Sequence, residues 1–266
     1  MEELRKRARE LLAAGEVKVV IGYGEGSAGR IRPLFITDPA GTGVLTYDER
    51  CLPNLAVYLL KAEVKQLGKA AVTAPLPVIR AVLQLAAESQ VSDETVRLIG
   101  VADGKAVDLP TLASAEEYVA SVSLEPAAEE KEALARIERM TMEERWAYWN
   151  EQLSRCLKCY ACRAACPMCY CTQCTVECNQ PQWIPVPATP LGNLEWHVMR
   201  AMHMAGRCVG CGECRRACPL DLPIDLLTKK IGEDVAAGFG LRAGSSRKLE
   251  YALSTYRPDD REDFIR

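Results

Sequence analysis

The spacing of the cysteines constrains this chain more than any other feature of its sequence. Twelve of its thirteen cysteines lie between positions 156 and 218, and Cys51 stands apart. Eight fall in the stretch SRCLKCYACRAACPMCYCTQCTVEC, and four more follow in RCVGCGECRRACP. Clustered cysteines are more often metal ligands than disulfides in a reducing compartment, and the odd total of thirteen points the same way.

Composition excludes several classes of protein. The first twenty residues contain no apolar segment followed by a small-residue cleavage site, and no apolar run approaches the ~20 residues of a transmembrane helix. We therefore expect a cytoplasmic chain without a membrane span. The net charge is -3, and the sequence has no long basic block of the kind that binds the phosphate backbone of a nucleic acid.

The two cysteine runs contain the same complete motif, C-x2-C-x2-C-x3-C-P. Three thiolates two residues apart can wrap one cubane, whereas the fourth, one turn later, points to the neighbouring cluster. The spacing therefore predicts two 4Fe-4S clusters with crossed ligands. We assign Cys156, Cys159, Cys162 and Cys218 to cluster 1, and Cys208, Cys211, Cys214 and Cys166 to cluster 2. Zinc also accepts four thiolates, but zinc ribbons usually present two separated pairs of cysteines, which does not match a triplet with a remote fourth.

Two clusters leave five cysteines without a role. Cys171 and Cys174, completed by Cys169, Cys178 or Cys51, have the spacing of a third metal site for iron-sulfur or zinc. If Cys51 supplied a ligand, the metal would link the first part of the chain to the cysteine-rich part. Free buried thiols are the main alternative, and a disulfide is disfavoured in a reducing compartment.

The first half of the chain has the alternating pattern of an α/β domain. Short β-rich runs such as VKVVIGY, KAAVTA and TVRLIGVAD alternate with helical patterns, among them residues 54–67 with Asn54 as N-cap. We expect an α/β domain over residues 1–124, a mainly α-helical dicluster domain over 125–240, and a partner-binding or disordered tail over 241–266.

A glycine pattern in the first domain raises the question of a nucleotide site. Gly24, Gly26 and Gly29 match G-x-G-x-x-G after a predicted strand. The next residues, RIRPLFI, do not open a helix, and a pyrophosphate site needs a helix N-terminus there. A hairpin loop is the preferred interpretation, with a nucleotide site as the alternative.

Other residues near the motifs have secondary roles in this interpretation. The two motifs and the residues just before them contain six cations and one acid, Glu213. We expect the cations to ease reduction of the clusters: Arg155, Lys158, Arg163, Arg207, Arg215 and Arg216. Between the runs, a helix is predicted from Asn193, as N-cap, to Gly206. Its His197 and His203 are expected to be structural, with their hydrogen bonds satisfied, and not ligands.

The chain resembles a known family. The stretches RCLKCYACRAACPMCYCTQC, QPQWIP, AGRCVGCGECRRACP and CLPNLAVYL are similar to iron-sulfur subunits related to the beta subunit of deazaflavin-reducing hydrogenases. Such subunits accompany formate dehydrogenases and heterodisulfide-reductase-like complexes of anaerobes. The helical surroundings of the motifs resemble the α-helical ferredoxin domain found in heterodisulfide reductase. At Thr73, Ala74 and Pro75 the chain departs from the glycine-cysteine-aspartate turn of the family, so we expect no flavin here.

The resemblance implies an iron-sulfur electron-transfer subunit. It would carry low-potential electrons between a flavoprotein and a redox partner within a multi-subunit anaerobic oxidoreductase, without catalytic residues of its own. The alternative is a flavin-binding catalytic subunit that reduces a nicotinamide or a deazaflavin. A zinc-bound interaction scaffold is a third class.

Metal content tests the cysteine assignments. Protein purified anaerobically should contain at least eight iron and eight acid-labile sulfide atoms per chain, because each cubane holds four of each. About four irons in reconstituted protein would contradict the two-cluster prediction.

The Cys171→Ser, Cys174→Ser double variant should lose iron or zinc beyond these eight atoms. Wild-type metal content in that variant would refute the third site.

Overall fold

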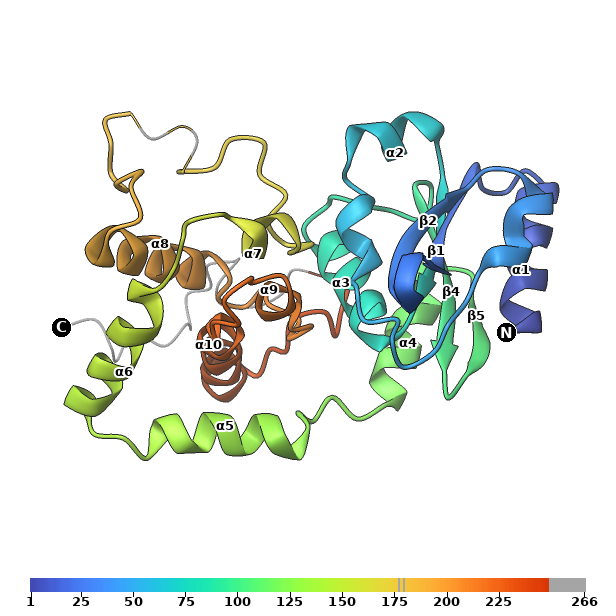
Figure 1. The fold of residues 1–266 in the computed structure, drawn as a ribbon. Coiled ribbons are helices and arrows are strands. Elements are labelled where there is room, and N and C mark those ends of the chain that lie inside the picture. The colour runs from blue at the N-terminus through green and yellow to red at the C-terminus, as the bar shows by residue number, and fades with distance from the viewer. Residues whose placement is uncertain (177, 179, 249–266) are drawn as a thin grey trace.

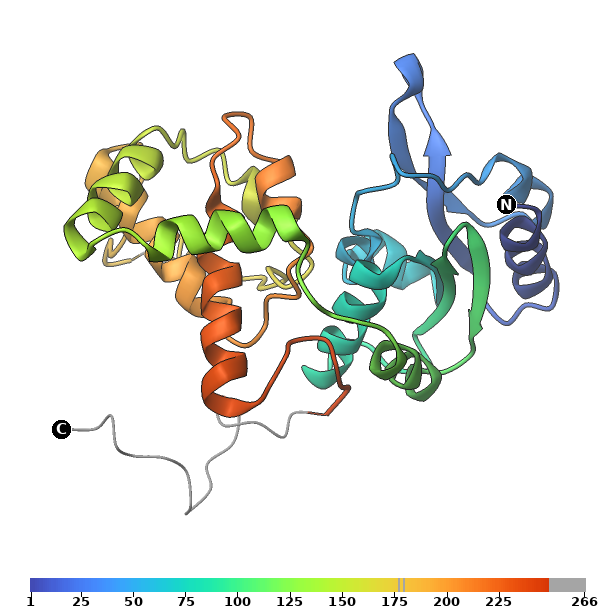
Figure 2. The same ribbon diagram turned by 90° about the horizontal axis from the view of Figure 1, so that it is seen from below.

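A computed structural model describes residues 1–176, 178 and 180–248. It has an α/β half followed by a helical half, which lie side by side in both views (Figures 1 and 2). This confirms the fold class expected from the sequence.

The N-terminal half is built on a five-stranded sheet with the strand order β2-β1-β3-β4-β5. The strands are β1 (Val19–Glu25), β2 (Ile31–Ile36), β3 (Ala70–Ala74), β4 (Val96–Ala102) and β5 (Lys105–Leu109). β1, β3 and β4 run parallel, whereas β2 and β5 pair antiparallel at the two edges. β3 is buried along its whole length, as expected for a central strand covered on both faces.

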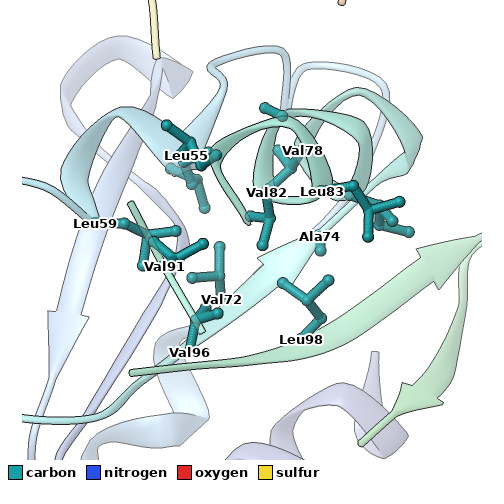
Figure 3. Close-up of a cluster of buried hydrophobic side chains, with 14 of the residues drawn as sticks. Leu55, Leu59, Val72, Ala74, Val78, Val82, Leu83, Val91, Val96 and Leu98 are labelled. Carbon is teal, nitrogen blue, oxygen red and sulfur yellow. The ribbon is translucent and has the colours of Figure 1, made fainter. Parts of the chain in front are cut away.

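Helices cover both faces of the sheet. The α-helices of this half are α1 (Glu2–Ala13), α2 (Ala62–Leu67), α3 (Leu76–Ala87) and α4 (Leu112–Ser121), and the 3-10 turns are η1 (Ser27–Gly29), η2 (Pro39–Val44) and η3 (Leu55–Tyr58). α1 packs on one face through Leu11 and Leu12, whereas η3, α3 and α4 pack on the other. Figure 3 shows Val72 and Ala74 of β3 facing Val78 and Val82 of α3.

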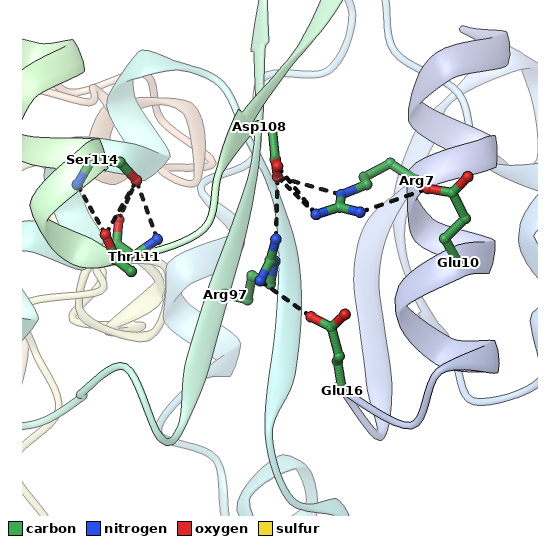
Figure 4. A network of polar contacts seen from close by, with 7 residues as sticks. All are labelled: Arg7, Glu10, Glu16, Arg97, Asp108, Thr111 and Ser114. Carbon is green, nitrogen blue, oxygen red and sulfur yellow. Dashed lines mark hydrogen bonds and ion pairs between the residues drawn. The ribbon is translucent and has the colours of Figure 1, made fainter.

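Ion pairs fasten α1 to the far edge of the sheet. Asp108 of β5 accepts from Arg7 Nη2 of α1 at 3.1 Å and from Arg97 Nη2 of β4 at 3.3 Å (Figure 4). Arg97 also pairs with Glu16 at 3.2 Å. A carboxylate shared by two guanidinium groups links α1 to the β4–β5 hairpin, which is distant from it in sequence.

The glycine pattern forms a hairpin, as preferred from the sequence. β1 and β2 pair antiparallel, and the three-residue turn η1 joins them. Gly26 N donates to Arg30 O at 2.7 Å across the turn. No long helix follows Gly29, so this loop does not offer the helix N-terminus that a pyrophosphate site requires.

The helix predicted over residues 54–67 was wrong in part. The segment forms two short helices, η3 and α2, separated by residues 59–61. Asn54 caps the first of them by accepting from Ala56 N at 3.2 Å. Leu55 and Ala56 are fully buried against the sheet, so tertiary packing fixes the first turn and the chain then redirects.

The helical half consists of α5 (Ala128–Glu138), α6 (Met142–Ser154), α7 (Ala161–Ala164), α8 (Pro190–His203), α9 (Glu213–Arg216) and α10 (Ile224–Phe239). α8 packs against α6 and α10. α6 begins with a capping box formed by Thr141 and Glu144. Within the described ranges, no helix is long and apolar enough to cross a membrane.

The predicted start of α8 was wrong. Thr189 is the N-cap, accepting from Gly192 N at 3.2 Å, and Pro190 occupies the first turn. Asn193 therefore lies inside the helix, fully buried. Its position frees the side chain for contacts with the cysteine loop.

A partly buried ion pair joins the two halves. Arg207, next to Cys208, donates to the carboxylate of Glu88 at the end of α3 at 2.8 and 2.6 Å. Tyr170 Oη donates to the same carboxylate at 2.6 Å, and the Arg207 guanidinium lies 5.4 Å from the Tyr170 ring centroid. Met168 and Met204 join the apolar core of the α/β half. The cysteine loops are thus packed directly on α3.

The segment after α10 also returns to α3. Arg80 Nη2 donates to Ala243 O at 2.7 Å, and Gly244 N donates to Gln84 Oε1 at 3.0 Å. Gly244 has φ 70°, and a Cβ there would collide with the Arg80 backbone. Residues 249–266 of the expected tail lie outside the described residues.

The Glu88→Ala substitution should destabilise the protein by about 2–3 kcal/mol, because it leaves Arg207 largely buried without its carboxylate. Burial raises the pKa of Glu88, but hydrogen bonds from Arg207, Tyr170 and Gln84 outweigh it and lower the pKa overall. A lowered folded-state pKa adds stability above the unfolded-state pKa, so the gap between wild type and variant should close as pH falls through the folded-state pKa.

The matched control is Glu132→Ala, which breaks an exposed pair with Arg139 and should cost less than about 1 kcal/mol. Anaerobic chemical denaturation followed by circular dichroism measures both. Equal losses in the two variants would show that the Glu88 contact does not join the halves.

Candidate metal centre

The two cysteine motifs follow the same backbone path 52 residues apart, as from 156 to 208. Lys158 and Gly210, two residues after the first cysteine of each copy, both have positive φ, 49° and 71°. Tyr160 and Gly212 also correspond, with φ 57° and 73°. The first copy thus uses lysine and tyrosine where glycine is favoured, so the loop geometry is imposed by its surroundings.

Each loop leads into one helical turn that carries the third cysteine inward. Cys162 lies in α7 and Cys214 in α9, and both are buried. The turns end with Cys166 N donating to Arg163 O at 3.2 Å and Cys218 N donating to Arg215 O at 2.9 Å. The fourth cysteine therefore follows the helical turn in the same way in both motifs.

Two cysteine-lined cavities lie where α7 and α9 meet. The first is lined by Cys156, Cys159, Cys162 and Cys218, together with Trp196 and His197. The second is lined by Cys166, Cys208, Cys211 and Cys214, together with Arg200, Asp225 and Thr228. Each cavity combines three cysteines of one motif with the last cysteine of the other, the grouping that crossed ligation requires.

Burial favours the thiol form of several of these sulfurs in the absence of metal. It raises the pKa values of Cys156, Cys162 and Cys208, and that of Cys211 to about 12. The charged form is costly in such a pocket unless a positive centre accompanies it. Four inward thiols around one cavity are therefore a donor set that suits a metal cluster.

Hydrogen-bond donors already surround the sulfurs. Lys158 N donates to Cys156 Sγ at 3.3 Å. The Thr228 hydroxyl and Gly210 N lower the pKa of Cys208 by hydrogen bonding, against the larger effect of burial, and Glu213 N does so for Cys211. Donors aimed at thiolates stabilise the negative charge of a bound cluster. The residues present fit two 4Fe-4S clusters.

α8 contributes residues that the sequence reasoning missed. Asn193 Nδ2 donates to Cys156 O at 2.8 Å and to Ser154 O at 3.3 Å, which fixes the entry to the first motif. Arg200 is 4% exposed and Nη2 donates to Cys162 O at 3.3 Å. A polar stripe at 193, 197 and 200 on one face of an otherwise apolar helix was the available signal.

The two histidines of α8 differ in burial. His203 is exposed, whereas His197 is 3% exposed and its Nε2 atom has no hydrogen-bond partner within the described structure. Burial lowers the pKa of His197 to about 4, and the positive charges of Arg200 and Lys158 act in the same direction. The imidazole is therefore neutral at neutral pH. The expectation of satisfied hydrogen bonds was wrong for Nε2.

Three of the six cations predicted to face the clusters have acidic partners among the ion pairs of the described residues. Arg207 pairs with Glu88, Arg215 with Asp221 at 3.0 Å and Arg216 with Glu213 at 2.5 Å. The expectation that Glu213 alone opposes the cations was therefore wrong. Lys158 differs from these, since it is 7% exposed and donates to Pro185 O.

The five cysteines outside the two motifs lie in different parts of the structure. Cys51 is buried in the α/β half, where Asp48 N donates to its sulfur at 3.4 Å, while Cys171 and Cys178 are exposed and Cys174 is half-buried. Cys169 lies beside Cys166; their hydrogen bond lowers the pKa of Cys169, and Arg200 adds to the effect. Among the described residues, no three His, Cys, Asp or Glu side chains meet closely enough to hold a single metal ion. The third site stays a prediction.

Comparison with protein families identifies the class. Residues 168–223 match the model of a 4Fe-4S dicluster domain. The match contains the whole second motif and the cysteines from Cys169 to Cys178, and it begins two residues after Cys166. The helical half therefore contains a 4Fe-4S dicluster domain, which defines the chain as an iron-sulfur protein.

Homologues of the chain are beta subunits of F420-dependent formate dehydrogenases. One, from Methanocaldococcus jannaschii, is 32% identical over 108 residues, which is 40% of this chain and 27% of the relative. Subunit beta of formate dehydrogenase 1 from Methanococcus maripaludis is 32% identical over 105 residues, 40% of this chain and 26% of that protein. The chain thus spans about a quarter of the length of these relatives.

The Cys166→Ser substitution tests the crossed assignment. It should remove or perturb cluster 2, although Cys166 belongs to the first motif, because its sulfur lines the second cavity. The electron paramagnetic resonance (EPR) signal affected should be the one that Cys211→Ser also affects. A change confined to the signal that Cys159→Ser affects would refute the crossed ligands.

Proposed function

We propose that this chain is the electron-transfer subunit of a multi-subunit oxidoreductase, with cluster 1 held by Cys156, Cys159, Cys162 and Cys218 and cluster 2 by Cys208, Cys211, Cys214 and Cys166. The observation that carries the proposal is the pair of adjoining cavities, each lined by four of these cysteines. Bound 4Fe-4S clusters supply one-electron acceptance and release.

The cavities differ in their access, which suggests a route for electrons. Cys159 of the first cavity is exposed and also lines an open cavity with Lys61 and Tyr170. None of the four cysteines of the second cavity is exposed, and Cys208 borders a further cavity with Arg80 and Leu124 near the α/β half. In this proposal, the chain exchanges electrons with one partner at the Cys159 edge and with another near Cys208.

The partners are proposed to be a flavoprotein and a second redox protein. The relatives named above support an assembly that handles formate or a deazaflavin, although this chain matches only a quarter of each. The α/β half, proposed as residues 1–124, serves as the base on which the cysteine loops rest. A third metal site at Cys171 and Cys174 remains part of the proposal.

Reconstituted protein should pass electrons only through a partner. Chain reduced with dithionite and freed of excess reductant should be reoxidised by an added flavodoxin-type flavoprotein, with growth of the flavin semiquinone spectrum. NADH, NADPH or a reduced deazaflavin alone should leave the oxidised chain unchanged. Stopped-flow absorbance under anaerobic conditions measures both.

The control is the Cys159→Ser, Cys211→Ser double variant, which should neither store electrons nor reduce the flavoprotein. Flavin in the purified chain, or cluster reduction by a nicotinamide or deazaflavin without a flavoprotein, would overturn the proposal. Either result would favour the catalytic-subunit alternative.

A further inference from the structure

Buried polar atoms without partners are concentrated on α8. Within the described ranges, eight buried side-chain nitrogen or oxygen atoms have no hydrogen-bond partner. Four of the eight belong to α8, on Asn193, Glu195, His197 and Arg200. An unpartnered buried polar group costs roughly 1–3 kcal/mol, so such a concentration on one helix needs a reason.

The two nitrogen atoms among these four belong to side chains that line the cysteine cavities. His197, with Nε2 unpartnered, lines the first cavity beside Cys156, Cys159 and Cys162. Arg200, with Nε unpartnered, lines the second cavity beside Cys166 and Cys214. One helix therefore presents one buried nitrogen-bearing side chain to each cavity, three residues apart.

The charge around Arg200 agrees with this placement. The guanidinium lies among cysteines, because Nη2 donates to Cys162 O at 3.3 Å and the side chain lines the cavity of Cys166 and Cys214. Two acids line the same cavity, and each has a cationic partner: Asp225 is paired with Lys229 at 3.1 Å and Glu213 with Arg216 at 2.5 Å. No ion pair between Arg200 and a carboxylate occurs in the described part of the chain. Its positive charge is directed to the sulfurs.

We propose that α8 supplies one buried positioning residue to each cluster: His197 donates a hydrogen bond from Nε2 to a sulfur of cluster 1, and the Arg200 guanidinium donates to the sulfurs of cluster 2. The proposal rests on the ligand sets proposed above, but not on the identity of any partner. The neutral imidazole carries one N–H, and the guanidinium carries five.

These contacts set the reduction potentials. A 4Fe-4S core of about +2 with four thiolates carries about -2, and reduction adds one more negative charge. A donor or a cation in a buried site stabilises the reduced form most, because little water screens it. His197 and Arg200 therefore raise the potentials of cluster 1 and cluster 2.

The test is an EPR-monitored potentiometric titration of the reconstituted full chain with dithionite as reductant. The wave of cluster 1 is identified as the one changed in Cys159→Ser, and that of cluster 2 as the one changed in Cys211→Ser. The His197→Phe substitution should lower the reduction equilibrium constant of cluster 1 at least tenfold, about 59 mV for one electron. Arg200→Gln should lower that of cluster 2 by at least the same factor.

Matched controls separate burial from residue type. His203→Phe removes an exposed histidine of the same helix, and Arg155→Gln removes an exposed cation next to Cys156. Neither should change either wave by more than about twofold, since solvent screens exposed charges. His197→Gln retains a donor and Arg200→Lys retains the charge, so both should restore most of the potential.

Iron and sulfide analysis of every variant checks the ligand sets independently: eight irons with an unshifted wave overturn the inference but not the proposed function. Control variants that shift as much as His197→Phe or Arg200→Gln, or conservative variants that restore nothing, also overturn it.

If His197→Phe loses its clusters, pulsed EPR of reduced wild-type protein with isotopically labelled histidine nitrogen decides. Coupling of one histidine nitrogen to cluster 1 supports the inference, and its absence refutes it.

Discussion

Each cysteine cavity is completed by the last cysteine of the other motif, and this exchange governs the helical half. Cys218 reaches the cavity of the first motif, and Cys166 reaches that of the second. Neither cavity can form from its own motif alone, so α7 and α9 must meet. The intervening chain, including α8, folds back between the motifs to allow it, which couples cluster assembly to tertiary folding.

Buried charge is the second constraint on this arrangement. Thiols with raised pKa values become good ligands only when a metal cluster compensates the cost of ionisation. Carboxylates neutralise three of the cations counted from the sequence, Arg207, Arg215 and Arg216. Arg200 differs because it is buried and lines a cysteine cavity. We therefore infer that electrostatic control comes from the helix between the motifs, and less from the cations within them.

The α/β half is attached to the cysteine loops through α3. Glu88 accepts from Arg207 and Tyr170, which flank the cysteines on two different loops, and residues 243 and 244 close on the same helix. A rigid base limits rearrangement of the loops when the charge of a cluster changes. The same packing buries the side of the second cavity and leaves Cys159 at the surface.

The sequence by itself determined the cluster class, because ligand spacing is a local property that survives in one dimension. It also determined the α/β alternation, the hairpin at Gly24–Gly29 and the capping box at Thr141, since each depends on neighbouring residues. Tertiary structure decided where the long-range partners lie. It broke the helix at residues 59–61, moved the start of α8 to Thr189, and turned Asn193, His197 and Arg200 towards the cysteine loops. Those outcomes depend on burial and on contacts distant in sequence, which a local pattern such as the polar stripe of α8 indicates only in part.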